Sequence, residues 1–253
     1  MKRSTALLPT LALALALGGC ASVPNQAAAT PGQQADPWEG WKRKVFAFND
    51  AVDNAVLKPV AEGYKAVVPS IVRTGVTNVF GNINDIWSTA NQFLQGKVQN
   101  GFEMGMRVLV NSFFGIGGLL DPATEMHLSK RSEDFGQTLG RWGVGPGPYV
   151  VLPLFGPSTL RDTFALPVDR HFAAGAYPQE QSVRYTVSAL ELINGRANLL
   201  ATTGLLDQVA LDRYSFIRDA YLSRRVDQIY DGAPPQEKFD DEPADAPSAP
   251  AKK

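Results

Sequence analysis

The order of apolar and polar positions along the chain predicts a mainly helical protein. Between residues 36 and 230, apolar side chains recur at spacings of three and four, which is typical of amphipathic helices. This spacing predicts helices over 70–94, 98–114, 132–142, 179–202 and 207–230. We therefore expect one helical domain, with no internal repeat and no Gly/Ser linker to divide it.

The first predicted helix carries its own start signal. Asp36 suits the N-cap, Pro37 the first helical position and Glu39 the acidic position of a capping box. Pro59 and Pro69 are expected to interrupt the segment that follows, because proline lacks the backbone N–H that a helix interior needs.

Aromatic residues on this first helix suit a membrane surface. Tryptophan is enriched where a bilayer meets water, and Trp38 and Trp41 open the apolar stripe. We take the helix as a candidate membrane-interface element, with Phe46, Phe48 and Asn49 as further members. Packing of the same aromatic side chains into a protein core is the alternative.

The predicted helix over 70–94 is apolar on one side and polar but uncharged on the other. Such a helix can cover a water-soluble core, or it can lie in a membrane with its polar groups turned inward. In the second case the polar side would line a passage for polar groups. The candidate lining residues are Thr74, Thr77, Asn78, Asn82, Ser88, Asn91 and Gln92. A plain solvent-exposed helix face is the alternative.

Glycine and proline alternate from residue 143 to residue 149, which rules out a helix there and predicts a rigid irregular loop. At membrane depth, irregular backbone is tolerated only where protein buries it or water lines it. We therefore expect Gly143, Gly145, Gly147 and Tyr149 to border the passage or a partner. The alternative is a structural connector.

The amino terminus resembles a lipoprotein signal. Two basic residues precede an apolar stretch over 7–17, which is too short to cross a bilayer. The sequence Leu17-Gly18-Gly19-Cys20 resembles a bacterial lipobox, which implies that Cys20 carries acyl chains and anchors the protein firmly. Residues 21 and 22 lack the aspartate that commonly retains lipoproteins at the inner membrane, so the periplasmic side of the outer membrane is favoured. An ordinary signal peptide, with Cys20 incidental, is the alternative.

Four segments follow from this organisation. They are a signal peptide over 1–19, a flexible tether over 20–35, the helical body over 36–230 and a disordered acidic tail over 231–253. No apolar run after Cys20 reaches the roughly 18 residues that a membrane-spanning helix needs.

Composition limits the possible chemistry. The 253 residues include 24 basic and 25 acidic side chains, so a basic nucleic-acid-binding surface is not expected. One cysteine excludes an internal disulfide, and two histidines leave little material for a metal site. We expect no metal and no cofactor. Residues 115–118 also lack the Gly-x-Gly-x-x-Gly spacing of a nucleotide site.

A lipid hydrolase is the rival interpretation. Ser158 could act as a nucleophile with His171 and either Asp162 or Asp169. However, Gly156-Pro157-Ser158-Thr159-Leu160 lacks the second glycine of a nucleophile elbow. Ser158 is more simply explained as a helix N-cap, so we expect no enzyme.

Several ordered blocks go beyond composition. Residues 36–50, 111–121, 135–153, 156–162 and 218–221 resemble the signatures of the MlaA (VacJ) family of outer-membrane lipoproteins. The resemblance implies a helical, ring-shaped domain in the periplasmic leaflet of the outer membrane. It also implies a trimeric porin as partner, and a soluble periplasmic carrier that receives phospholipid removed from the outer leaflet.

The residues support the same idea independently. A charged headgroup crosses hydrocarbon only at a cost of several kcal/mol or more. Neutral amides and hydroxyls along 70–94 could lower that cost without trapping the lipid. A purely structural envelope lipoprotein remains the alternative that the sequence separates least well from a transporter.

Overall fold

The computed structural model describes residues 38–175 and 180–234. The chain divides into two units, Met1–Pro37 and Trp38–Lys253, and the fold described below belongs to the second. The signal peptide, the tether, Cys20, Asp36, Pro37 and residues 235–253 of the tail lie outside the described residues. The expectations for those segments therefore remain predictions.

Helices make up most of the described chain, which confirms the mainly α prediction. They are α2 (Glu39–Val52), the π-helical turn η2 (Asp53–Leu57), α3 (Lys58–Val67), α4 (Ser70–Leu94), α5 (Val98–Phe113), α6 (Pro122–Glu125), α7 (Phe135–Arg141), α8 (Leu160–Gly175), α9 (Gln181–Val209) and α10 (Arg213–Ile229). Two short strands, β1 (Tyr149–Leu152) and β2 (Gly156–Thr159), pair antiparallel as a hairpin with Tyr149 opposite Thr159. The periodicity did not predict this hairpin.

The two prolines behave differently. Pro69 separates α3 from α4, because Val68 is extended and Pro69 is the N-cap of α4. Pro59 interrupts nothing, since α2, η2 and α3 follow one another without a gap. The wider π turn just before it accommodates the missing N–H and the proline ring within a continuous helical path.

Several predicted helix ends are corrected. The first helix begins at Glu39 with Trp38 as its N-cap, at φ 63° and without a side-chain cap. Helix α7 begins after Asp134, whose carboxylate accepts from the Gln137 amide, rather than at residue 132. Helix α9 continues to Val209, past its predicted end at 202, and the last helix therefore begins at Arg213 rather than at residue 207. In each case the periodicity located the helix, and local capping or packing set its end.

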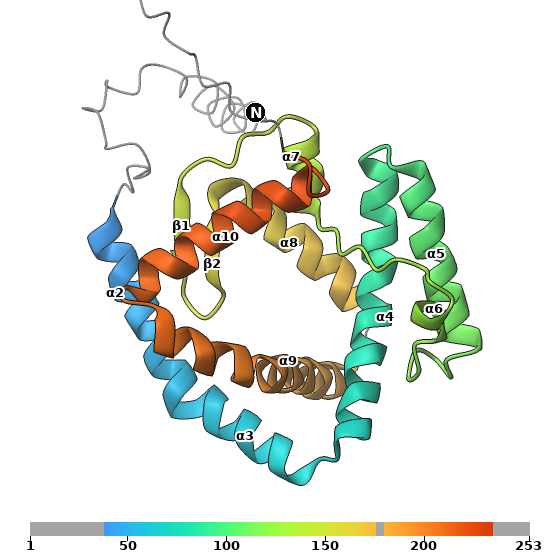
Figure 1. Cartoon of the computed structure of the whole chain (residues 1–253), viewed down its shortest axis with the longest axis horizontal. Helices are drawn as coiled ribbons and strands as arrows, with labels where there is room; N and C mark the ends of the chain where they lie inside the picture. Colours follow the sequence, from blue (N-terminus) through green and yellow to red (C-terminus); the bar gives the residue numbers. More distant parts are fainter. Residues whose placement is uncertain (1–37, 176–179, 235–253) are drawn as a thin grey trace, which may run out of the picture. The chain divides into compact units, whose positions relative to one another are not determined.

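Within the second unit the helices form a closed, ring-like circuit (Figure 1). Helices α4 and α5 lie antiparallel, α3 packs on α9, and α7 packs on α8 and α10. The last helix returns to the first, because Arg43 of α2 pairs with Asp212 at 2.6 Å and Phe46 packs edge-on against Tyr214. Across the described residues no helix combines the length and apolar character that crossing a bilayer requires.

Candidate functional site: a polar interior beneath an apolar surface

The outer face of α5 is apolar and exposed. Its large side chains recur at spacings of three and four, so they share one side of the helix. They are Val98, Phe102, Met106, Leu109 and Phe113. Phe113 is 79% exposed and Phe102 66% exposed. A continuous apolar face of this kind marks contact with a membrane or another protein.

The same character continues elsewhere on the surface. Val67 and Ile71, on either side of the turn between α3 and α4, are 82% and 80% exposed. Helix α9 exposes Leu192, Leu199 and Leu205. Apolar exposure is therefore a property of several helices rather than of one patch.

The predicted interface residues of α2 divide into two groups. Trp38, Trp41 and Phe48 are exposed, as a membrane-interface role requires. Phe46 instead packs against Tyr214 of α10, with ring centroids 5.8 Å apart. Asn49 turns to the β-hairpin: it donates to the Leu152 carbonyl at 2.9 Å and accepts from the Leu154 amide at 2.7 Å. Phe46 and Asn49 thus join α2 to the rest of the fold.

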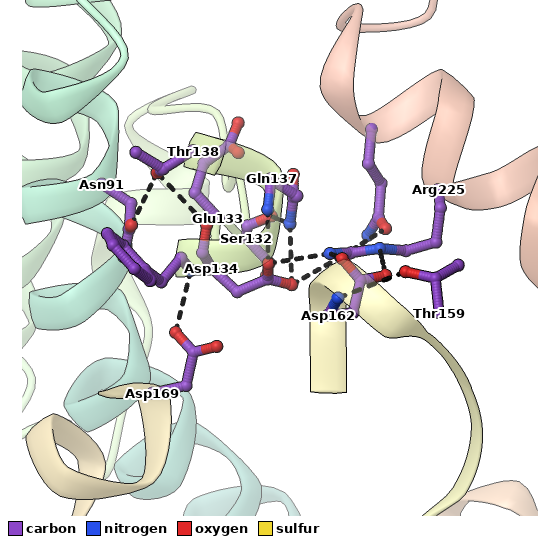
Figure 2. Close-up of polar contacts among 12 residues, drawn as sticks. Asn91, Ser132, Glu133, Asp134, Gln137, Thr138, Thr159, Asp162, Asp169 and Arg225 are labelled. Atoms are coloured by element: carbon purple, nitrogen blue, oxygen red, sulfur yellow. Dashed lines mark hydrogen bonds and ion pairs between the residues drawn. The ribbon is translucent and has the colours of Figure 1, made fainter. Parts of the chain in front are cut away.

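The interior beneath this surface is polar. In the second half of α4, Asn91 is fully buried and accepts from the Thr138 hydroxyl at 2.7 Å (Figure 2). Ser88 donates to the Glu133 carbonyl, and Gln92 donates to the Glu133 carboxylate at 3.3 Å. Burial raises the pKa of Glu133, and the hydrogen bond from Gln95 and the Lys97 ammonium only partly oppose this.

These contacts correct part of the predicted passage. Ser88, Asn91 and Gln92 are buried against the segment 133–138, and Asn82 is buried with its amide donating to Ser112 at 3.0 Å. Protein covers these four side chains, so they do not face water. The helix period showed which residues share a face but not what packs on it.

The first half of α4 differs. Thr74 and Thr77 are exposed, and Asn78 is half-buried with its amide donating to the Leu119 carbonyl at 3.1 Å. Thr77 accepts from two amides of α9, Asn194 at 2.8 Å and Asn198 at 3.0 Å. Neutral polar groups of α4 and α9 therefore meet at this point.

The Gly/Pro segment forms the expected irregular loop, with Gly143, Gly145 and Gly147 exposed. Tyr149 departs from the prediction, because it begins β1 and is buried in a small apolar core with Val151 and Tyr214. Its aromatic ring suits that core better than a wet passage.

Figure 2 shows a partly buried ionic cluster that the sequence did not reveal, in which Arg225 of α10 lies between Asp134 and Asp162. The guanidinium bonds both oxygens of each carboxylate at 2.6 to 2.9 Å. Burial works to raise the pKa of each carboxyl, but the hydrogen bonds and charge of Arg225 outweigh it and lower the pKa. Asp134 stood directly before a predicted helix, which is a capping signal, but no sequence rule pairs it with an arginine 91 residues away.

A second missed cluster surrounds Arg107 of α5, which is 1% exposed. Its guanidinium bonds both oxygens of Asp121 at 3.0 Å and also donates to Thr124 and to the Leu128 carbonyl. Asp85 of α4 lies 3.8 Å from its Nε. The cluster joins α4 and α5 to the segment that follows them.

In the described part of the chain no hydrogen bond joins Ser158 to His171, Asp162 or Asp169, so the residues of the hydrolase hypothesis are not connected as a triad. The Ser158 hydroxyl lies on β2 and bonds to the Thr163 hydroxyl at 3.0 Å and the Thr159 carbonyl. Asp162 accepts from Tyr221 and Arg225, and Asp169 accepts from the Trp87 indole at 2.7 Å. Thr159, rather than Ser158, caps α8 by accepting from the Asp162 amide.

Comparisons with known proteins agree with this architecture. The MlaA lipoprotein family profile matches residues 34–228. The chain is 37% identical to the intermembrane phospholipid transport system lipoprotein MlaA of Escherichia coli (strain K12), covering 83% of this chain and 85% of that protein. It is 32% identical to the protein of the same name from Haemophilus influenzae, over 92% and 93%.

One solved structure also superposes well. It comes from work on the structural basis for maintenance of bacterial outer membrane lipid asymmetry. The likeness has a TM-score of 0.66 at 35% identity and covers 78% of this chain and all of that one. With the family profile and the two relatives, it leads to one conclusion: the chain belongs to the MlaA lipoprotein family.

Proposed function

We propose that this protein is an outer-membrane lipoprotein that maintains lipid asymmetry. In this proposal acyl chains on Cys20 anchor it on the periplasmic side, and its ring-like domain lies in the inner leaflet of that membrane. It removes phospholipid mislocalised to the outer leaflet and passes it to a soluble periplasmic carrier. The names of the relatives and the subject of the matching structure support this role.

The main support for the proposal is that large apolar side chains are exposed while many polar side chains are buried, the reverse of the distribution usual in water. The outward residues of α5 and the turn between α3 and α4 are apolar, whereas buried positions include Asn91, Arg107 and Gln92. In water such a surface would be a liability, but in hydrocarbon it is the favourable arrangement. A trimeric porin, as second partner, would contact part of the same apolar surface.

Fewer residues are proposed to line the passage than the helix pattern predicted. Thr74, Thr77 and Asn78 remain candidate lining residues on α4. Gly143, Gly145 and Gly147 remain candidates on the loop. Neutral groups at these positions would solvate a headgroup while the acyl chains stay in lipid, which lowers the cost of desolvating the phosphate. No covalent step is involved.

Leaflet labelling in whole cells tests the function. A membrane-impermeant, amine-reactive reagent reports phosphatidylethanolamine at the cell surface. Cells that lack the protein should show a raised signal and greater sensitivity to detergent with chelator, and the wild-type chain should reverse both. Unchanged labelling in the deletion strain would reject transport and favour a scaffolding lipoprotein.

The loop is tested by one substitution. A Cβ at Gly145 meets nothing within 4 Å, so Gly145→Val fills the loop without a clash. Gly147 is unsuitable, because its φ is +65° and a Cβ there lies 3.0 Å from Leu160. Gly145→Val should slow clearance of surface phospholipid, while Gly63→Val, at another open position, should not. A fully active Gly145→Val protein would remove the loop from the passage.

A further inference from the structure

A small pocket lies beside α7, and its lining includes Glu133, which accepts hydrogen bonds from Ser88 and Gln92 of α4. Its volume is about 320 Å³, and it is formed by the segment that precedes α7 and the last turns of α10. Its lining includes Arg131, Ser132, Glu133, Gln137, Arg224, Asp227 and Asp231. Small-molecule sites begin at about 300 Å³, so the volume suits a polar headgroup better than acyl chains.

Two arginines of this pocket have no carboxylate partner among the described residues. Arg131 is half-buried, and its Nε is shielded from solvent without any acceptor. Arg224 is exposed and makes no ion pair in the described chain. By contrast, Arg225, which follows Arg224 directly in the chain, bonds two carboxylates. A guanidinium partly removed from water without an acceptor is costly, and phosphate is a geometric match for it.

The acidic lining is mostly neutralised. The Lys97 ammonium lies 2.7 Å from Asp231 and 3.2 Å from Glu133. The Asp227 carboxylate makes no such bond in the described part of the protein. Gln137 is 2% exposed, and its Oε1 has no donor. The pocket thus offers two unpaired cations, one unpaired carboxylate and one unused amide oxygen.

We propose that this pocket binds the headgroup of a phospholipid, with the phosphodiester held by Arg131 and Arg224. The Ser132 hydroxyl can donate to the same phosphate. Asp227 faces the ammonium of an ethanolamine headgroup, whose positive charge balances the phosphate. The site rests on the proposed transport function and adds to it a headgroup preference for a zwitterion over an anionic lipid.

Calorimetric titration of the full-length protein in detergent micelles tests the site. The probe is sn-glycero-3-phosphoethanolamine, which carries the headgroup without acyl chains. The double variant Arg131→Gln/Arg224→Gln should bind it at least tenfold more weakly, because charged hydrogen bonds to the phosphate are lost. Arg184→Gln, on α9 and outside the pocket, should bind as the wild type does. Circular dichroism should show that each variant is folded.

The second arm distinguishes the headgroup from a simple anion. Asp227→Asn should weaken glycerophosphoethanolamine but leave glycerophosphoglycerol unchanged, since only the first carries an ammonium. Equal affinity of wild type and double variant would overturn the proposal. Inorganic phosphate binding as tightly as glycerophosphoethanolamine would also overturn it. Either result leaves the leaflet-labelling test untouched, so the two proposals fail separately.

Discussion

Two buried arginines, Arg225 and Arg107, hold the domain together in different ways. All three nitrogens of Arg225 donate to the carboxylates of Asp134 and Asp162, and the longest of those bonds is 2.9 Å. Arg107 bonds one carboxylate, Asp121, while its Nε makes no hydrogen bond and forms only a longer ion pair with Asp85, at 3.8 Å. The residue types are the same, but the hydrogen bonding is complete in only one cluster.

The pKa values of Asp162 and Asp85 shift in opposite directions in the two clusters. Asp162 has a lowered pKa, because bonds from Arg225 and Tyr221 outweigh the effect of burial. Burial raises the pKa of Asp85 by more than the Lys130 and Arg107 charges lower it. Proximity to a guanidinium therefore does not decide the sign; direct, short hydrogen bonds to a buried carboxylate do.

The largest expected effect is loss of the fully bonded arginine. Arg225→Met should lower the free energy of unfolding by about 3–5 kcal/mol, because two carboxylates lose their buried cation. Arg107→Met should cost less, about 2 kcal/mol, since Asp121 keeps bonds from Asn111 and Thr124. Denaturant unfolding in detergent, followed by circular dichroism, measures both. Equal losses would show that hydrogen-bond completeness does not matter here.

The next largest effect is expected from removing the charge of one carboxylate in each cluster. Asp162→Asn should cost about 2 kcal/mol, because it removes the charge that Arg225 and Tyr221 both bond. Asp85→Asn should change stability by less than about 1 kcal/mol, since its Oδ2 accepts no hydrogen bond. The same unfolding experiment gives both values. A loss for Asp85→Asn as large as that for Asp162→Asn would contradict the comparison.

These clusters also mark the limit of what the sequence predicts. The bounds of helix α4 were predicted correctly, because apolar residues recur at helical spacing throughout its 25 residues. Its polar face was misassigned in part, since Asn91 and Ser88 are covered by a segment more than 40 residues away. The β-hairpin was missed because each strand has only four residues. Long-range pairing and short strands leave no periodic trace.

Acid titration should shift the contributions of Asp85 and Asp162 to stability in opposite directions. Asp85 has a raised folded pKa, so its cost is greatest at neutral pH and shrinks as pH falls toward the unfolded value of about 4. Asp162 has a lowered folded pKa, so its contribution holds above about pH 4 and is lost as pH falls through the folded value. As pH falls from this raised folded pKa toward about 4, the wild type should therefore gain stability relative to Asp85→Asn. Over the same range the gap between wild type and Asp162→Asn should stay constant, and parallel shifts in both pairs would refute the assignment.

The smallest expected effect isolates a single hydroxyl in each cluster. Tyr221→Phe removes a 2.8 Å bond to Asp162 in a partly buried setting and should cost about 1 kcal/mol. Thr124→Val removes a 2.6 Å bond to Asp121 and the acceptor of a 3.2 Å bond from Arg107, whose Nη1 keeps its bond to the Leu128 carbonyl. Because Thr124 is exposed, water replaces the lost hydroxyl and the cost should stay below about 0.5 kcal/mol. The Thr124 bond is the shorter of the two but the more exposed, so comparing the two variants shows whether bond length or burial determines the loss of stability. If Thr124→Val proves the more costly, bond length rather than exclusion of water governs these clusters. Complete hydrogen bonding would then matter only for the guanidinium groups of Arg225 and Arg107.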